Sequence, residues 1–400
     1  MNKNYKRVQR TGILLASLFA LTACGSGDGE TADSQTLRFT NFDPEHMAGP
    51  QTKAMGESLQ EDTDGRISFD YYWNGSLLPG PEVPSGIAGG TADIGLMLTA
   101  YTPEDFPIGD WSESLMSLPA MDHPAGILQS AATHADVVLS NEDILQEFSD
   151  QGLKVLAPVV PYSNFDLLCV DPVTDLESAE GKRVRVAGEV WADEAAALGM
   201  QPVNLEPGEI YEGLQRGVID CVVHHPPGYI GNSTWEVAKH YTTVPFSGAM
   251  AYLVMSEDVW EGLSAEDQQA FVDASAVYFS EFEQKSLQDY AEFAEDGENE
   301  HDISWHEPDD ALIDELQTHQ EEARAGLSSD APEALSDPDA YIEAYEDGMS
   351  DWSVKLETTN LNLEDFNDEA TAYLEAPNME ISEYEDLILE GVFNEHATSE

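Results

Sequence analysis

The residues with the clearest capacity for chemistry are the cations between Glu180 and His225. The chain has 78 Asp and Glu against 16 Lys and Arg, and three of those cations, Lys182, Arg183 and Arg185, fall within four consecutive positions. An Arg side chain presents a planar fork of donors that binds a carboxylate through two parallel hydrogen bonds. These arginines could therefore bind an acidic ligand, or they could pair with the abundant surface carboxylates.

The elements that carry these cations follow from the pattern around them. The stretch predicts a strand over 182–186, a helix over 189–198, a loop, a second helix over 209–216 and a strand over 218–223. Because alternate side chains of a strand share a face, Arg183 and Arg185 point one way and Lys182 and Val184 the other.

A repeated strand–helix order precedes this stretch. Strands are expected over 36–40 and 66–73 and after the Gly90-Thr-Ala-Asp-Ile-Gly95 motif, with helices over 49–60 and 82–89. This order predicts a parallel sheet with right-handed crossovers. Strands over 153–159 and 165–170 would cross between lobes, and a strand over 248–256 would return. A capping box at Ser264 opens a long helix, and the chain beyond residue 300 is acidic and helical.

Ligands of open α/β sheets bind outside the carboxyl ends of the strands. This rule selects a set of candidate ligand residues: Asn41, Phe42, Tyr101, Asn164, Phe165, Arg185, His224 and His225. Several could instead be structural. Asn41 could hold a turn, Phe42 could belong to the core, Tyr101 could pack on a hinge, and the two histidines could form a hydrogen-bonded pair. No metal site is expected, since no carboxylate stands at helical or hairpin spacing beside these histidines.

The order of motifs resembles the solute-binding proteins of TRAP (tripartite ATP-independent periplasmic) transporters, of the C4-dicarboxylate-binding type. The matching segments run from about residue 36 to about 290. They are 176–186 with its Gly-Lys-Arg-Val-Arg-Val, then Ala197-Leu198-Gly199, Pro202-Val203, the Glu209-Ile-Tyr-Glu-Gly-Leu-Gln-Arg-Gly-Val-Ile-Asp220 run, Gly90–Gly95 and, more weakly, Ser76-Leu77.

This resemblance implies a fold and a function. The fold is α/β and two-lobed, like periplasmic binding proteins, with a mainly parallel sheet flanked by helices in each lobe and a helical C-terminal extension. The implied protein is an extracytoplasmic receptor that captures a small organic carboxylate between closing lobes and delivers it to TRAP membrane permease subunits, without a cofactor. The family's carboxylate-clamping Arg falls on Arg185, and its polar or aromatic contacts fall on His224 and His225.

Some positions depart from the family pattern, so the ligand stays open. Asn164 stands where many relatives have a second Arg, Pro207 stands where they often have an aromatic or polar contact, and Cys221 replaces a Gly. A small organic acid, a keto acid and a zwitterionic solute remain possible ligands. Lobe 1 is expected over 36–158, completed by about 247–262, lobe 2 over 159–246, and a helical C-terminal region over 263–400.

The N-terminus has the pattern of a targeting segment. A basic stretch over 1–10 precedes the apolar residues 12–20, and Leu21-Thr22-Ala23-Cys24 follows as a lipobox. Residues 1–24 therefore predict a lipoprotein signal peptide, with Cys24 lipidated and tethering the protein to the outer face of the cell membrane. Plain secretion with an ordinary Cys24 is also compatible with this pattern. Residues 25–35 are expected to be a flexible linker.

Composition narrows the remaining function classes. A net charge of −62 disfavours nucleic-acid binding. The acidic residues are spread among aromatic and aliphatic residues, which suggests a high-salt, halophilic setting in which repulsion between the negative charges is screened.

Cys169 and Cys221 could pair or stay as small buried residues. No G-x-S-x-G, H-E-x-x-H or nucleotide-binding loop is present, so an enzyme is not expected. A binding subunit of an ATP-driven importer and a signalling receptor with the same fold remain compatible with the sequence.

Overall fold

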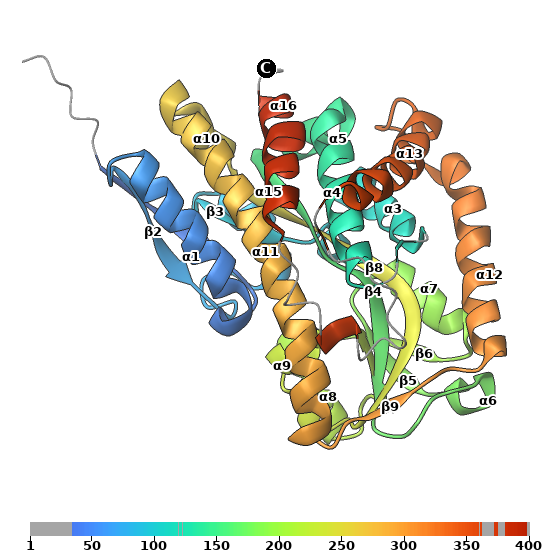
Figure 1. Ribbon diagram of the computed structural model, residues 1–400. Helices are drawn as coiled ribbons and strands as arrows, with labels where there is room; N and C mark the ends of the chain where they lie inside the picture. Colours follow the sequence, from blue (N-terminus) through green and yellow to red (C-terminus); the bar gives the residue numbers. More distant parts are fainter. Residues whose placement is uncertain are drawn as a thin grey trace, which may run out of the picture. The chain divides into compact units, whose positions relative to one another are not determined.

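One mixed β-sheet runs through the computed structural model of the protein (Figure 1). The structure describes residues 34–118, 120–121, 123–359, 361, 372–374 and 381–397, with side chains for all of these except residues 161–164, 298, 396 and 397. The sheet has nine strands in this described part, in the order β2-β1-β3-β8-β4-β7-β5-β6, with β9 beside β8. The predicted signal peptide, Cys24 and most of the predicted linker lie outside the described residues.

The strands are β1 (Gln35–Thr40), β2 (Ile67–Tyr72), β3 (Ile94–Met97), β4 (Leu153–Cys169), β5 (Arg183–Val186), β6 (Gln201–Asn204), β7 (Cys221–His224), β8 (His240–Ser256) and β9 (Ser304–His306). The α-helices of the first half of the chain are α1 (Glu45–Asp62), α2 (Val83–Ala88), α3 (Pro107–Ser112), α4 (Ala125–Ser140), α5 (Glu142–Asp150), α6 (Leu176–Ala179) and α7 (Glu189–Ala197). The others described are α8 (Ile210–Gln215), α9 (Pro226–Gly231), α10 (Glu257–Glu261), α11 (Ala265–Asn299), α12 (Asp310–Leu327), α13 (Pro338–Glu357), α15 (Ser382–Ile388) and α16 (Asn394–Ala397).

Each end of the sheet is parallel, as the strand–helix order predicted. Strand β1 pairs in parallel with β2 and β3, and β5 pairs in parallel with β6 and β7. The long strands β4 and β8 lie antiparallel between these two ends and join them into one sheet. The two lobes of the fold therefore share a continuous pair of strands.

The structure corrects several predicted boundaries. The two strands expected over 153–159 and 165–170 are one 17-residue strand, β4, and β8 begins at His240 rather than at residue 248. Proline normally breaks a central strand, but Pro161 falls within an irregularity in the β4–β8 register between Val159 and Tyr162, where a ladder donor is not required. Strand β6 replaces part of the predicted loop, and β9 interrupts the region predicted as helical.

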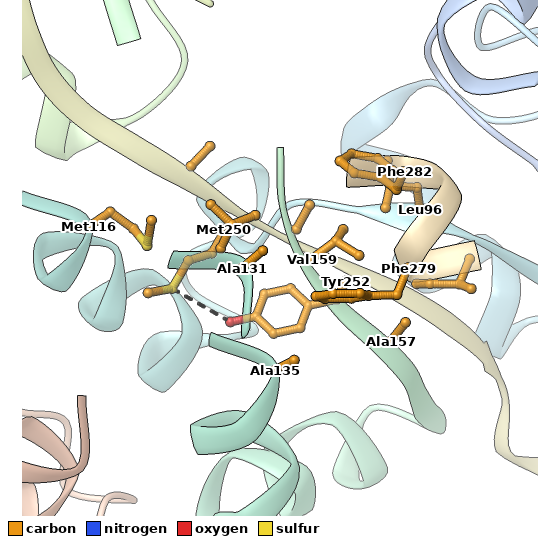
Figure 2. Close-up of a cluster of buried hydrophobic side chains, with 14 of the residues drawn as sticks. Leu96, Met116, Ala131, Ala135, Ala157, Val159, Met250, Tyr252, Phe279 and Phe282 are labelled. Carbon is orange, nitrogen blue, oxygen red and sulfur yellow. Dashed lines mark hydrogen bonds between the residues drawn. The ribbon is translucent and has the colours of Figure 1, made fainter. Parts of the chain in front are cut away.

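Alternation along β8 divides the core into two layers. Met250 and Tyr252 point toward α4, where the Tyr252 ring lies 5.3 Å from the ring of His134, centroid to centroid. Figure 2 shows Tyr252 beside Met250, its hydroxyl 4.0 Å from the sulfur, among Ala131 and Ala135 of α4. Ala249 and Ala251 project to the opposite face and border a cavity there.

Helix α11 lies along that opposite face, where it packs on β4. At 35 residues it is about 52 Å long, and it packs against α1 at one end and α9 at the other. Ser264 caps it, because its hydroxyl accepts the backbone N–H of Asp267 at 3.1 Å, as the capping-box prediction expected. Within the described part of the chain, every helix is too short or too polar to cross a bilayer.

Candidate ligand-binding site

Strand ends from both halves of the sheet border one cavity of about 70 Å³. One water molecule needs about 10–15 Å³, so the space matches a small solute. Its wall contains six of the eight candidate ligand residues, namely Phe42, Tyr101, Phe165, Arg185, His224 and His225. The wall also includes Asp43, Met47, Ala48, Gln51, Leu96, Leu98, Ala187, Trp191, Pro207, Ala249, Ala251, Phe282, Lys285, Ser286 and Asp289.

The other two candidates lie outside this lining. Asn41 is buried, and its Oδ1 accepts the backbone N–H of Asp43 at 2.8 Å. Asn41 therefore holds a turn, which is the structural role that its position in the sequence also allows. The backbone of Asn164 pairs with Ser247 in the β4–β8 ladder, while its side chain is outside the described residues.

Arg185 is the charged residue most completely enclosed in this wall. Its side chain is 1% exposed on β5, and its Nε donates to the Leu205 carbonyl at 2.9 Å. Burial lowers the pKa of the guanidinium, and the nearby Tyr101 and Glu206 partly offset that effect. Among the residues the structure describes, no carboxylate lies within 4 Å of it, so its charge has no ion-pair partner there.

Arg183, two residues earlier on β5, has a different environment. Its guanidinium forms a two-pronged pair with Asp220, in which Nε and one terminal nitrogen donate at 2.9 and 2.7 Å. The surface-pairing interpretation therefore applies to Arg183, whereas Arg185 lies at the cavity.

An aromatic pair from the first half of the sheet faces Arg185. Phe42 follows β1, Tyr101 follows β3, and their ring centroids lie 5.7 Å apart in an edge-to-face arrangement. Burial raises the pKa of Tyr101 to about 12, although the positive charge of the nearby Arg185 acts in the opposite direction. A neutral phenol therefore lies close to the guanidinium in this wall.

A second aromatic group comes from the other half of the sheet. The ring of Phe165 stacks on Trp191, with centroids 5.3 Å apart and planes 10° apart, and the Trp191 indole donates to the Ser247 carbonyl at 2.7 Å. His224 and His225 lie beyond Phe165, and a Cβ at Gly228 would stand 2.4 Å from the His224 ring, so only Gly admits this packing. Burial and Arg185 hold the pKa of both histidines well below the usual range, so both are neutral.

Two buried polar atoms of the wall suit a ligand. His224 Nδ1 and Gln51 Oε1 have no hydrogen-bond partner in the described part of the protein. Unsatisfied buried polar atoms are costly, so a polar group entering the cavity would be favoured. His225, in contrast, accepts the Gly228 N–H at 3.0 Å and caps α9.

Sequence reasoning missed the part of the wall formed by α11. Phe282, Lys285, Ser286 and Asp289 follow helical spacing, so they share one face of the helix. A Lys inside a long acidic helix was the available signal in a cation-poor chain. Asp43 was missed because acids are common everywhere in this sequence.

The sequence left open whether Cys169 and Cys221 pair, and the register between β4 and β7 answers this question. Cys169 of β4 stands directly opposite Cys221 of β7, and the two form a disulfide with a Cα–Cα distance of 4.1 Å. The bond joins the second parallel unit to the central strands. In the described part of the chain no group of three metal-ligating side chains is present.

A two-lobed α/β fold with a small, mostly apolar cavity and a buried Arg in its wall fits a solute-binding protein. The family model for bacterial extracellular solute-binding proteins, family 7, matches residues 40–325, and the chain belongs to this family. It is an extracytoplasmic solute receptor of the TRAP type, as the motifs predicted. The family consists of solute-binding receptors.

Relatives and solved structures agree with this assignment. A solute-binding protein of Roseobacter denitrificans is 29% identical over 274 residues, which cover 66% of this chain and 78% of that protein. The ectoine-binding periplasmic protein of Halomonas elongata is 30% identical over 137 residues, covering 34% of this chain and 40% of that protein. A marine metagenome TRAP solute-binding protein in complex with pyroglutamate has a TM-score of 0.68 at 18% identity, covering 79% of this chain and 99% of that one. The predicted fold class is thus confirmed.

Proposed function

We propose that the cavity is the ligand site and that Arg185 binds the carboxylate of a small organic acid there. The observation that carries this proposal is the buried guanidinium without an ion-pair partner among the described residues. Enclosing an unpaired charge costs several kcal/mol, and an anionic ligand would remove that cost. A relative solved with pyroglutamate, an organic acid, supports the same chemistry.

A thermal-shift screen of the full chain in mild detergent and about 2 M KCl tests the proposal. The panel holds dicarboxylates, keto acids, sugar acids, aromatic acids and amino acids. A true ligand at a hundredfold excess over Kd should stabilise the protein by about 2.7 kcal/mol. Arg185→Ala should abolish that shift, and the matched control Arg216→Ala, at an exposed Arg paired with Glu212, should retain it. A shift that survives Arg185→Ala would place the ligand elsewhere.

Closure of two lobes would enclose this ligand. We propose lobe 1 over 36–158, completed by about 247–262, lobe 2 over 159–246, and a helical C-terminal region over 263–400. The closed form would then dock on TRAP permease subunits and release the ligand to them. X-ray scattering of the ligand-free and ligand-saturated chain should show a smaller radius of gyration with ligand. An unchanged radius would argue against closure.

Tethering at the membrane is proposed from the N-terminal sequence. Cleavage before Cys24 and lipidation of its thiol and amino group would anchor the receptor to the outer face of the cell membrane. Expression in a bacterial host should give a membrane-bound protein, and Cys24→Ala should release it or leave it unprocessed. A wild-type protein found wholly in the soluble fraction would contradict the anchor.

A high-salt setting is proposed from the charge. At a net charge of −62, self-repulsion is long-ranged in dilute buffer and screened within about 3 Å at 1 M salt. The unfolding midpoint should therefore rise steeply with KCl. Independence from salt would count against the halophilic interpretation.

A further inference from the structure

Four charged side chains from three segments of the chain line the cavity, two of each sign. Lys285 and Asp289 of α11 form an ion pair with each other. Arg185 and Asp43 are different, because within the described residues neither has an oppositely charged partner within 4 Å. The cavity therefore contains one unpaired positive group and one unpaired negative group.

Asp43 is held in place by the fold. Its backbone N–H donates to Asn41 Oδ1 at 2.8 Å, and its backbone carbonyl accepts the Asn74 N–H at 2.9 Å. Phe42, the preceding residue, packs on Tyr101. The carboxylate is thus presented at the wall by a loop fixed on both sides, after β1, while Arg185 extends from β5.

Tyr101 stands within electrostatic reach of both groups. The charges of Arg185 and of Asp43 both act on its phenol, and all three residues line the cavity. The acid, the phenol and the guanidinium therefore belong to the wall of one cavity. A small molecule in this cavity has both charged groups in its wall.

In a chain so rich in acidic residues, an Asp exposed to solvent is expected, but an Asp in the wall of the cavity is not. Asp43 is partly buried, and this burial raises the pKa of its carboxyl to about 7, which means that its ionised form is destabilised without a partner. Burial raises the pKa of Asp289 only to about 6, since Lys285 stabilises its charged form. The protein keeps an uncompensated acid where an apolar side chain would cost less.

We propose that this receptor is specific for a zwitterion, whose carboxylate binds Arg185 and whose protonated nitrogen binds Asp43. This inference rests on the proposed function of the cavity and names the ligand class within it. Asp43 is then the specificity-determining residue that separates compact nitrogen-containing carboxylates from simple organic acids. Each charge of the ligand neutralises one unpaired charge of the wall.

Matched probes test the proposal by calorimetric titration of the full chain in about 2 M KCl. L-Proline and ectoine carry a cationic nitrogen, and tetrahydrofuran-2-carboxylate replaces the proline nitrogen with oxygen. Wild type should bind at least one zwitterion more tightly than the oxygen analogue, by about thirtyfold or more, since breaking one member of an enclosed charge pair has an effect of that size. Asp43→Asn should remove this preference while retaining binding of the oxygen analogue. Asp70→Asn, at an exposed Asp of β2, is the matched control and should change nothing.

The pH dependence provides a second readout. A cationic partner requires ionised Asp43, so zwitterion affinity should rise between about pH 6 and 8 and level off above, because Asp43 titrates near 7 in the free protein. Four other groups near Asp43 or in the cavity wall do not titrate in this range: the pKa values of Tyr101 and Tyr278 are raised further above it, and those of His224 and His225 are well below it. Asp289 titrates near 6, so Asp289→Asn serves as the control that should keep the rise.

The outcomes separate this inference from the proposed function. Three results would overturn the zwitterion inference and leave the carboxylate receptor intact. They are tighter binding of the oxygen analogue, zwitterion affinity that falls as the pH rises, and equal losses of affinity for both probes in Asp43→Asn. Binding of either probe that is unaffected by Arg185→Ala would overturn the proposed site itself. A zwitterion preference that depends on both Arg185 and Asp43 supports both.

Discussion

The two parallel units of the sheet, β1–β3 and β5–β7, contain the same kind of Arg–Asp pair. They differ at the residue that stands two positions after this Arg. Arg38 of β1 binds Asp93 through its backbone N–H, Nε and a terminal nitrogen, at 2.7, 2.9 and 2.7 Å. Arg183 of β5 binds Asp220 in the same way, at 2.9, 2.9 and 2.7 Å. Both acids precede the third strand of their unit.

Two residues later the units diverge. Thr40 on β1 is fully buried, and a Cβ at the neighbouring Gly95 would stand 2.8 Å from its methyl group. The equivalent residue on β5 is Arg185, which reaches the cavity. The repeated Arg–Asp pair thus stabilises the scaffold, and the ligand charge is placed where only one unit has room for a long side chain.

The units also differ in how their third strand is fastened. Cys221 of β7 is bonded to Cys169 of β4, whereas Ile94 of β3 faces Met255 of β8 at the corresponding position. A covalent bond in one unit stands where the other uses apolar packing. The comparison can be tested by removing these features one at a time.

Loss of the disulfide should have the largest effect on stability. Replacing Cys169 and Cys221 together by Ser opens a link between residues 52 apart and should lower the free energy of unfolding by about 4 kcal/mol. Denaturant titration measures the change. The lobe 1 control Met255→Leu should cost less than about 1.5 kcal/mol. A loss below that control would mean that packing, and not the bond, fastens β7.

Removal of the paired acids should have an intermediate and symmetric effect on stability. Asp93→Ala and Asp220→Ala each leave a backbone N–H and a guanidinium without their acceptor, at a cost of about 2 kcal/mol in unfolding free energy. Their effects on ligand binding should differ, because only Asp220 supports the strand that carries Arg185. Binding should weaken about tenfold in Asp220→Ala and stay unchanged in Asp93→Ala. Equal losses of affinity would mean that the two units are coupled more tightly than the pairs indicate.

Replacement of Thr40 should have the smallest effect and should be stabilising. Its buried hydroxyl has no hydrogen-bond partner in the described residues, so Thr40→Val removes a desolvated polar group at nearly constant volume. The free energy of unfolding should rise by about 1 kcal/mol, with ligand affinity unchanged. Destabilisation would reveal a water or side chain that satisfies the hydroxyl.

The strand–helix order along the chain, the parallel pairing and the location of Arg185 at the cavity could be predicted from the sequence. Hydrophobic runs with glycine and aspartate between them define the strands, and the two-residue period determines which side chains share a face. Ligand residues at strand ends follow from the same rule, which is why Phe42, Tyr101, Phe165, His224 and His225 came together with Arg185.

Only the tertiary structure decided the rest of the site. The wall formed by Phe282, Lys285 and Asp289 depends on how α11 crosses the sheet, which no local pattern encodes. Asp43 can be recognised as a candidate ligand residue because it has no charged partner in the described part of the chain. That property depends on packing and not on residue type. Continuity of β4 through Pro161 required the bulge and its partner strand β8. Local sequence determines conformation and the facing of side chains, whereas burial and the pairing of charges arise only when distant segments meet.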